Sequence, residues 1–123
     1  MSIKITLNED HHYIHGYYYD EVVLGDLQEF STTILKFFNE TTYETLHLVV
    51  DVNEVKYQSI NVAKAWKSIM EAANHTKLGA VIVVGVSNIS TKFLIELLAK
   101  LGKADLKTVS THDEAITMLK SLN

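Results

Sequence analysis

Short strand-like runs alternate with segments of helical periodicity along the chain, and this alternation limits the fold more than any other feature. The strand-like runs lie near residues 3–7, 13–19, 46–50, 80–86 and 104–109, and the helical segments near 24–38, 62–73, 93–101 and 111–122. Within each helical segment apolar residues recur at spacings of three and four, as on one buried face of a helix. Thr111 and Glu114 match the capping-box pattern, which predicts the start of the last helix. The run 80–86, AVIVVGV, is uncharged and rich in β-branched residues, which is typical of a strand covered on both faces.

The connections between these segments predict the direction of the strands. Only the polar sequence NEDHH separates the first two runs, which favours an antiparallel hairpin, and Gly16 in the second run suggests a bulge or a close backbone approach. Each later strand follows a helix, and such crossovers make strands parallel. The sequence therefore predicts an α/β fold: a mixed central sheet with an N-terminal antiparallel hairpin, the remaining strands parallel, and about four flanking helices.

The composition indicates one globular domain spanning residues 1–123. Hydrophobic residues make up 47% of the chain and charged residues 21%, and no segment resembles a linker. Because cysteine is absent, disulfides and zinc–thiolate sites are excluded. No secretory signal is visible, and the longest apolar stretch, 78–86, is shorter than the roughly 20 residues of a membrane-spanning helix. We expect a cytoplasmic protein without a membrane span, and the net charge of −4 argues against nucleic acid as a partner.

The order of the segments resembles the SpoIIAA-like branch of the STAS (sulfate transporter and anti-sigma factor antagonist) fold. The resemblance covers nearly the whole chain and is carried by LHLVVDVNEV at 46–55, AVIVVG at 80–85 and ADLKTVSTHDEAITMLKSL at 104–122. These motifs are structural rather than catalytic. The resemblance therefore implies a single SpoIIAA/STAS-like domain that works as a regulatory or protein-interaction module.

One segment of the family pattern has a defined regulatory role in anti-sigma factor antagonists. There a strand ending in aspartate leads to a bend of the type Asp-Ser-Ser-Gly, whose serine is phosphorylated by a partner kinase. Asp51, Val55 and Tyr57 match this pattern, whereas Ser59, Ile60 and Asn61 occupy the positions of the aspartate and the paired serines. The resemblance thus implies a module without the usual phosphoserine switch. Capping of the next helix by Ser59 or Asn61 explains these residues, and phosphorylation of Ser59 is the alternative.

Polar residues after two central strands form the candidate binding surface. In open α/β sheets ligands bind beyond the carboxyl ends of the strands, so two polar loops are expected to converge there. The alternative is that the same residues serve only as helix caps and turns. The candidates are Asp51, Asn53, Glu54, Tyr57, Ser59, Asn61, Ser87, Asn88 and Ser90.

The aromatic run GYYYDEVV suggests a second kind of site. Tyr17 and Tyr19 could line an apolar pocket with Phe37, Phe38 and Trp66, which would suit a carrier or sensor of a small, lipid-like molecule. Core packing is the simpler explanation of these side chains, and an exposed aromatic strand could also be a homodimer contact.

The histidines do not complete a metal site in the sequence. His11, His12 and His15 cluster near the N-terminus, and imidazoles of this kind can bind divalent metals, but no spaced set of carboxylates or thiols accompanies them. His47, His75 and His112 are isolated in the sequence. No catalytic motif, cofactor motif or Gly-rich phosphate loop is present, so we expect no enzyme activity, no cofactor and no metal, and a protein as partner.

Overall fold

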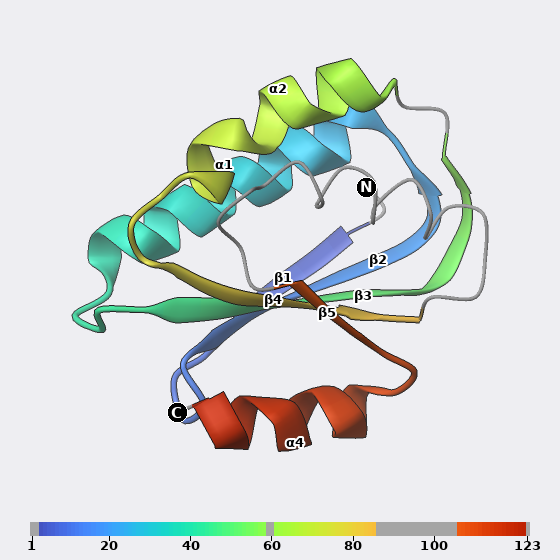
Figure 1. The fold of residues 1–123 in the computed structure, drawn as a ribbon. Coiled ribbons are helices and arrows are strands. Elements are labelled where there is room, and N and C mark those ends of the chain that lie inside the picture. The colour runs from blue at the N-terminus through green and yellow to red at the C-terminus, as the bar shows by residue number, and fades with distance from the viewer. Residues whose placement is uncertain (1–2, 59–60, 86–105, 123) are drawn as a thin grey trace.

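Five strands form one mixed sheet in a computed structural model that describes residues 3–58, 61–85 and 106–122 (Figure 1). The strands follow the order β1-β2-β3-β4-β5; β1 is antiparallel to β2, and the other neighbouring pairs are parallel, as predicted. The elements are β1 (Ile3–Asn8), β2 (Tyr13–Val22), α1 (Leu24–Glu40), β3 (Leu46–Gln58), α2 (Val62–Ala73), β4 (Leu78–Val84), β5 (Leu106–Val109) and α4 (His112–Leu122). The described residues contain three helices, one fewer than the expected four, and the predicted helix over 93–101 lies outside them.

The helices cover the two faces of the sheet unequally. Helices α1 and α2 lie together on one face, whereas α4 lies on the opposite face (Figure 1). The crossovers β2-α1-β3 and β3-α2-β4 advance across the sheet in the same direction, and right-handed crossovers of this kind place their helices on the same face. Helix α4 follows the last strand and is free to pack on the other face. Among the described helices, none has the length and apolar character needed to cross a membrane.

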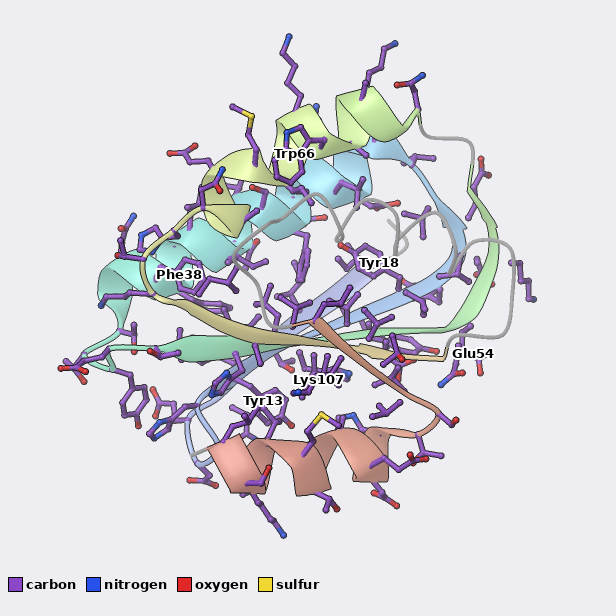
Figure 2. All side chains as sticks on the ribbon, in the orientation of Figure 1. Tyr13, Tyr18, Phe38, Glu54, Trp66 and Lys107 are labelled. Carbon is purple, nitrogen blue, oxygen red and sulfur yellow. The ribbon has the colours of Figure 1, made fainter. Side chains whose placement is uncertain are left out.

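Each face of the sheet has its own apolar core. The α1–α2 side contains Ile14, Tyr18 and the helix residues Leu27, Phe30, Ile34 and Phe38, which recur with helical spacing. The α4 side contains Val49, Ile82 and Val84 packed against Ala115 and Leu119. Tyr13 belongs to the same core and lies between the sheet and α4 (Figure 2). In β2, Tyr13 belongs to the core on the α4 side and Ile14 to the core on the other side. Because side chains alternate along a strand, the odd-numbered residues in the first half of β2 face α4. This direction determines which side chains meet at the candidate site.

Gly16 leaves room for a side chain of α1 rather than for the expected second backbone. A Cβ atom at this position would lie 2.6 Å from Phe30 Cε1 and 2.9 Å from Phe30 Cζ, so the ring of α1 occupies the space next to the β2 backbone. Only glycine allows the helix to pack this closely on the strand.

The strand expected near residues 46–50 is longer than predicted, because the polar residues 51–58 after it also belong to the strand. Strand β3 continues to Gln58 and pairs with the second half of β2, with Tyr19 opposite Glu54 and Val22 opposite Gln58. Register shifts near Tyr19 and Glu21 accommodate the longer ladder. Buried Val52 and Val55 anchor this extension to the core, so packing and ladder hydrogen bonds outweigh its polar composition.

Asn61, one of the two expected caps, is the N-cap of helix α2. The Asn61 side chain accepts hydrogen bonds from the backbone N–H groups of Ala63 at 2.9 Å and Lys64 at 3.3 Å, which confirms Asn61 as the cap. Ser59, the other candidate cap and the candidate phosphorylation site, lies outside the described residues.

Candidate functional site

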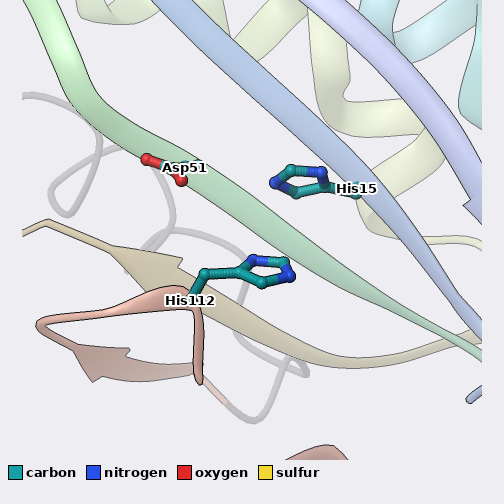
Figure 3. Close-up of side chains that lie close together, drawn as sticks. All are labelled: His15, Asp51 and His112. Atoms are coloured by element: carbon teal, nitrogen blue, oxygen red, sulfur yellow. The ribbon is translucent and has the colours of Figure 1, made fainter. Parts of the chain in front are cut away.

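Three side chains from distant parts of the chain meet on the α4 side of the sheet (Figure 3). They are His15 of β2, Asp51 of β3 and His112, the first residue of α4. Each offers one potential ligand atom, and these atoms all lie within 4.8 Å of one another. All three residues are partly buried, so the cluster is neither part of the core nor fully hydrated.

Strand register places the first two residues. In the parallel β2–β3 pair, His15 is opposite Val49 and Tyr17 is opposite Asp51, so Asp51 lies two residues beyond the partner of His15. Because side chains alternate along a strand, both residues share the face on which Val49 packs toward α4. The cluster thus follows directly from the pairing of the two strands.

The start of α4 places the third residue. Thr111 Oγ1 accepts a hydrogen bond from the Glu114 backbone N–H at 3.2 Å and donates to Glu114 Oε1 at 3.2 Å. This confirms the capping interaction predicted between Thr111 and Glu114 and fixes the residue at which the helix begins. Since His112 is the first helical residue, its ring lies beside His15 rather than farther along α4.

Two ring nitrogens of the cluster lack hydrogen-bond partners. Among the described residues, neither Nε2 of His15 nor Nδ1 of His112 makes a hydrogen bond, although both atoms are buried. Burial lowers the pKa of His15, the nearby His112 lowers it further, and the Asp51 carboxylate partly opposes both effects. The lowered pKa of His15 favours its neutral form, which has a lone pair on one nitrogen.

The Asp51 carboxylate is oriented by its own strand. The backbone N–H of Asn53 donates to Asp51 Oδ1 at 3.1 Å. The Asn53 side chain packs against Gly85, where a Cβ atom would collide with it and where φ is +96°, a conformation that favours glycine. This contact packs β3 at Asn53 against the residue that follows β4.

An aromatic and acidic surface continues from the cluster along β2 and β3. Tyr17 and Tyr19 stack with ring centroids 5.6 Å apart, and they pair in register with Asp51 and Glu54 respectively. Desolvation raises the pKa of Tyr17, and the negative charges of Glu54, Asp51 and Asp20 raise it further. We call Tyr17, Tyr19, Asp51 and Glu54 the tyrosine–acid strip.

The structure brings together only some of the predicted binding residues. Asp51, Asn53 and Glu54 lie together in β3, whereas Asn61 is used as a helix cap. The backbone of Tyr57 is paired with Glu21 in the sheet. The predicted residues of the second loop and the cap, namely Ser59, Ser87, Asn88 and Ser90, lie outside the described residues, so convergence of the two loops stays a prediction.

The five aromatic residues of the predicted apolar pocket do not line a common space. Tyr17 and Tyr19 are on the α4 side, whereas Phe38 is fully buried on the other side of the sheet, and Phe37 and Trp66 pack against that same core. A pocket of about 430 Å³ lies elsewhere and is lined by Leu7, Glu9, Phe37, Glu40, Thr41, Thr42 and Tyr43. Phe37 is the only one of the five aromatic residues in this lining.

Sequence reasoning grouped the wrong histidines. His12 stacks on Tyr43 with ring centroids 3.9 Å apart, whereas His15 lies beside His112, which had seemed isolated. Two signals were present in the sequence: Asp51 directly follows an apolar run, and the Thr111–Glu114 capping pattern marks the start of α4. The missing information was that α4 crosses the face opposite α1 and α2, which apolar periodicity does not encode.

Comparisons with known proteins agree with this architecture. No family model matches the chain, and no curated protein matches it. A solved structure of an uncharacterised DUF3478-family protein with a SpoIIAA-like fold, from Shewanella loihica PV-4, is similar with a TM-score of 0.66. The two chains are 14% identical, and the match covers 95% of this chain and 91% of the other. This chain therefore has the SpoIIAA-like fold expected from its sequence.

Proposed function

We propose that the protein is a non-catalytic STAS-like interaction module, and that its tyrosine–acid strip binds a positively charged segment of a protein partner. The main support for this proposal is the stacked Tyr17–Tyr19 pair, which lies in register with Asp51 and Glu54. Aromatic faces attract cationic side chains, and arginine in particular stacks on tyrosine while donating hydrogen bonds to a carboxylate. A lysine- or arginine-bearing segment therefore matches both components of the strip.

The charge around the strip supports this choice of partner. Asp51, Glu54 and Asp20 all act on Tyr17, and the chain as a whole has a net charge of −4. Lys56 contacts Asp20 at 3.7 Å, but both side chains are largely exposed, so this ion pair is weak and easily exchanged for a partner's cation. Association through such a surface should weaken as salt is added.

The phosphoserine switch and the lipid-like ligand have less support. Ile60 occupies the usual acceptor position, so the proposed module works without phosphorylation at that bend. An apolar carrier would need an enclosed aromatic site, but the five predicted aromatic residues lie on different sides of the sheet. An apolar ligand that copurifies stoichiometrically in native mass spectrometry would favour the carrier function instead.

Site-specific photo-crosslinking tests the proposal. A photoreactive phenylalanine analogue at Tyr19 should capture a protein through a segment rich in lysine or arginine, whereas the same analogue at Met70, an exposed residue of α2, should not. Tyr17→Ser and Glu54→Gln should each weaken binding of the captured segment about tenfold, and Met70→Ser should leave it unchanged. Equal capture at both positions, or an acidic captured segment, would contradict the proposal.

A further inference from the structure

The His15–Asp51–His112 cluster has the ligand set of a metal site, and we propose that it binds one divalent first-row transition-metal ion of the zinc class. Imidazole nitrogen suits zinc and its neighbours in the series, whereas magnesium and calcium prefer sites made of oxygen alone. Two imidazoles and one carboxylate are a ligand set found in zinc sites that keep an open coordination position. Because the chain has no cysteine, a zinc site in it depends on nitrogen and oxygen ligands of this kind.

The geometry is close to what such an ion requires. Bonds of about 2.0–2.1 Å in a tetrahedral arrangement place two ligand atoms about 3.4 Å apart. The three potential ligand atoms lie within 4.8 Å of one another, so modest side-chain rotations bring them to that separation. All three residues are only partly buried, so the cluster is not enclosed in the core.

The unpartnered ring nitrogens independently indicate a missing ligand. Buried polar atoms in proteins nearly always have a hydrogen-bond partner, and exceptions call for an explanation such as an ion. Here Nε2 of His15 and Nδ1 of His112 are both buried without such a partner among the described residues, and both belong to this cluster. A cation between the rings would give each imidazole a partner that the described residues do not supply.

The surroundings of the cluster support a cation there. The Asn53 N–H bonds Asp51 Oδ1, and hydrogen bonds of this kind orient the carboxylates that bind metals. The N-terminal end of α4 carries partial positive charge, which disfavours a cation. The Asp51 carboxylate and the acidic residues of the first turn, Asp113 and Glu114, supply negative charge against this effect.

The site overlaps the proposed partner surface only at Asp51. The other two ligands, His15 and His112, are not part of the tyrosine–acid strip, and Tyr17, Tyr19 and Glu54 are not ligands. The metal proposal therefore does not depend on the proposed function. Glu54→Gln should weaken binding of the captured segment about tenfold and retain metal binding, so the failure of one proposal can be distinguished from the failure of the other.

Calorimetric titration of chelator-treated, full-length protein with zinc chloride tests the site. We expect one zinc ion per chain, and His15→Ala and His112→Ala should each lower the affinity by at least about 100-fold. His12→Asn is the matched control, because His12 is a nearby histidine outside the cluster and asparagine tolerates its φ of 54°. This control should bind zinc within about twofold of the wild type, as expected of a residue that is not a ligand.

A spectroscopic measurement keeps the test decisive if a variant fails to fold. In imidazole ¹⁵N spectra of the wild-type protein, zinc should shift the resonances of His15 and His112 and leave those of His12 in place. Absence of zinc binding, unchanged affinity in folded His15→Ala and His112→Ala, or shifts confined to the other histidines would each overturn the proposal.

Discussion

The rings of His15 and His112 lie 4.9 Å apart between centroids, with their planes at 53°, although the two residues belong to the second strand and the last helix. This contact exists only when α4 is docked on the sheet. It joins the first part of the chain to its C-terminal end across the α4 face, where Tyr13 and Leu119 form part of the same small core. The chemistry of the cluster and the docking of α4 are therefore linked.

The lowered pKa of His15 predicts that stability falls with acidification. In the unfolded chain this histidine has its ordinary pKa of 6.5, whereas in the folded chain its pKa is lower and the ring stays neutral to a lower pH. Between these two values the unfolded state binds more protons, so the free energy of unfolding should decrease as the pH falls below about 6.5. The groups that face the ring are His112 of α4 and Asp51 of β3.

Urea denaturation of chelator-treated protein at a series of pH values measures this effect. His15→Gln should show a shallower pH dependence over the same window, whereas His12→Asn should keep the wild-type dependence. An identical slope in the wild type and His15→Gln would show that another group is responsible.

Removing the Asn61 cap should destabilise the protein by about 1 kcal/mol. The side-chain oxygen of Asn61 satisfies two backbone N–H groups at the start of α2, and Asn61→Ala leaves both to solvent. Asn61→Asp is the matched control, because an aspartate at the same position accepts the same hydrogen bonds and interacts favourably with the helix dipole. Thermal and urea denaturation should therefore rank wild type and Asn61→Asp together, above Asn61→Ala.

The sequence predicted those features of the fold that depend on local periodicity. The apolar spacing of Leu27, Phe30 and Ile34 identified α1, and the uncharged run around Ile82 identified a central strand. The extension of β3 to Gln58 was missed because polar residues such as Asn53 and Glu54 resemble a bend, and only pairing with the second half of β2 makes them a strand.

The candidate site was only partly predictable for a related reason. Asp51 was recognised from its place at the end of an apolar run, and the Thr111–Glu114 capping pattern located the start of α4. The contact of His112 with His15 depends on which face α4 covers, and the place of Asp51 beside them depends on the β2–β3 register. Both are tertiary properties, and neither changes the local spacing of apolar residues.

Gly16→Ala should destabilise the protein by about 1–3 kcal/mol, as expected of overpacking against a rigid ring. The added Cβ would lie 2.6 Å from Phe30 Cε1, and Phe30 is itself buried between α1 and the sheet. Gly25→Ala is the matched control, since a Cβ there meets no atom within 4 Å and alanine favours the helix. This control should be neutral or stabilising by up to about 1 kcal/mol.

A double-mutant cycle separates overpacking from loss of backbone freedom. If the collision with the ring is the cause, the cost of Gly16→Ala should be much smaller in a Phe30→Leu background, measured by urea denaturation. Equal costs in both backgrounds would instead assign the effect to the backbone at Gly16.

Zinc should stabilise the folded protein if the cluster binds it as proposed. A ligand that binds only the folded state at 100 times its dissociation constant adds about 2.7 kcal/mol to the free energy of unfolding. The ligands come from β2, β3 and α4, so unfolding separates them and releases the ion. Thermal denaturation with and without zinc should show this increase, and a chelator should reverse it.

The variants give this last prediction its specificity. His112→Ala should remove most of the zinc-dependent increase, because it removes the only ligand contributed by α4. Tyr19→Ser should retain the increase, since Tyr19 belongs to the strip but not to the cluster. An equal zinc-dependent increase in His112→Ala and the wild type would mean that the ion binds elsewhere, and would leave the two unpartnered ring nitrogens to be explained by water.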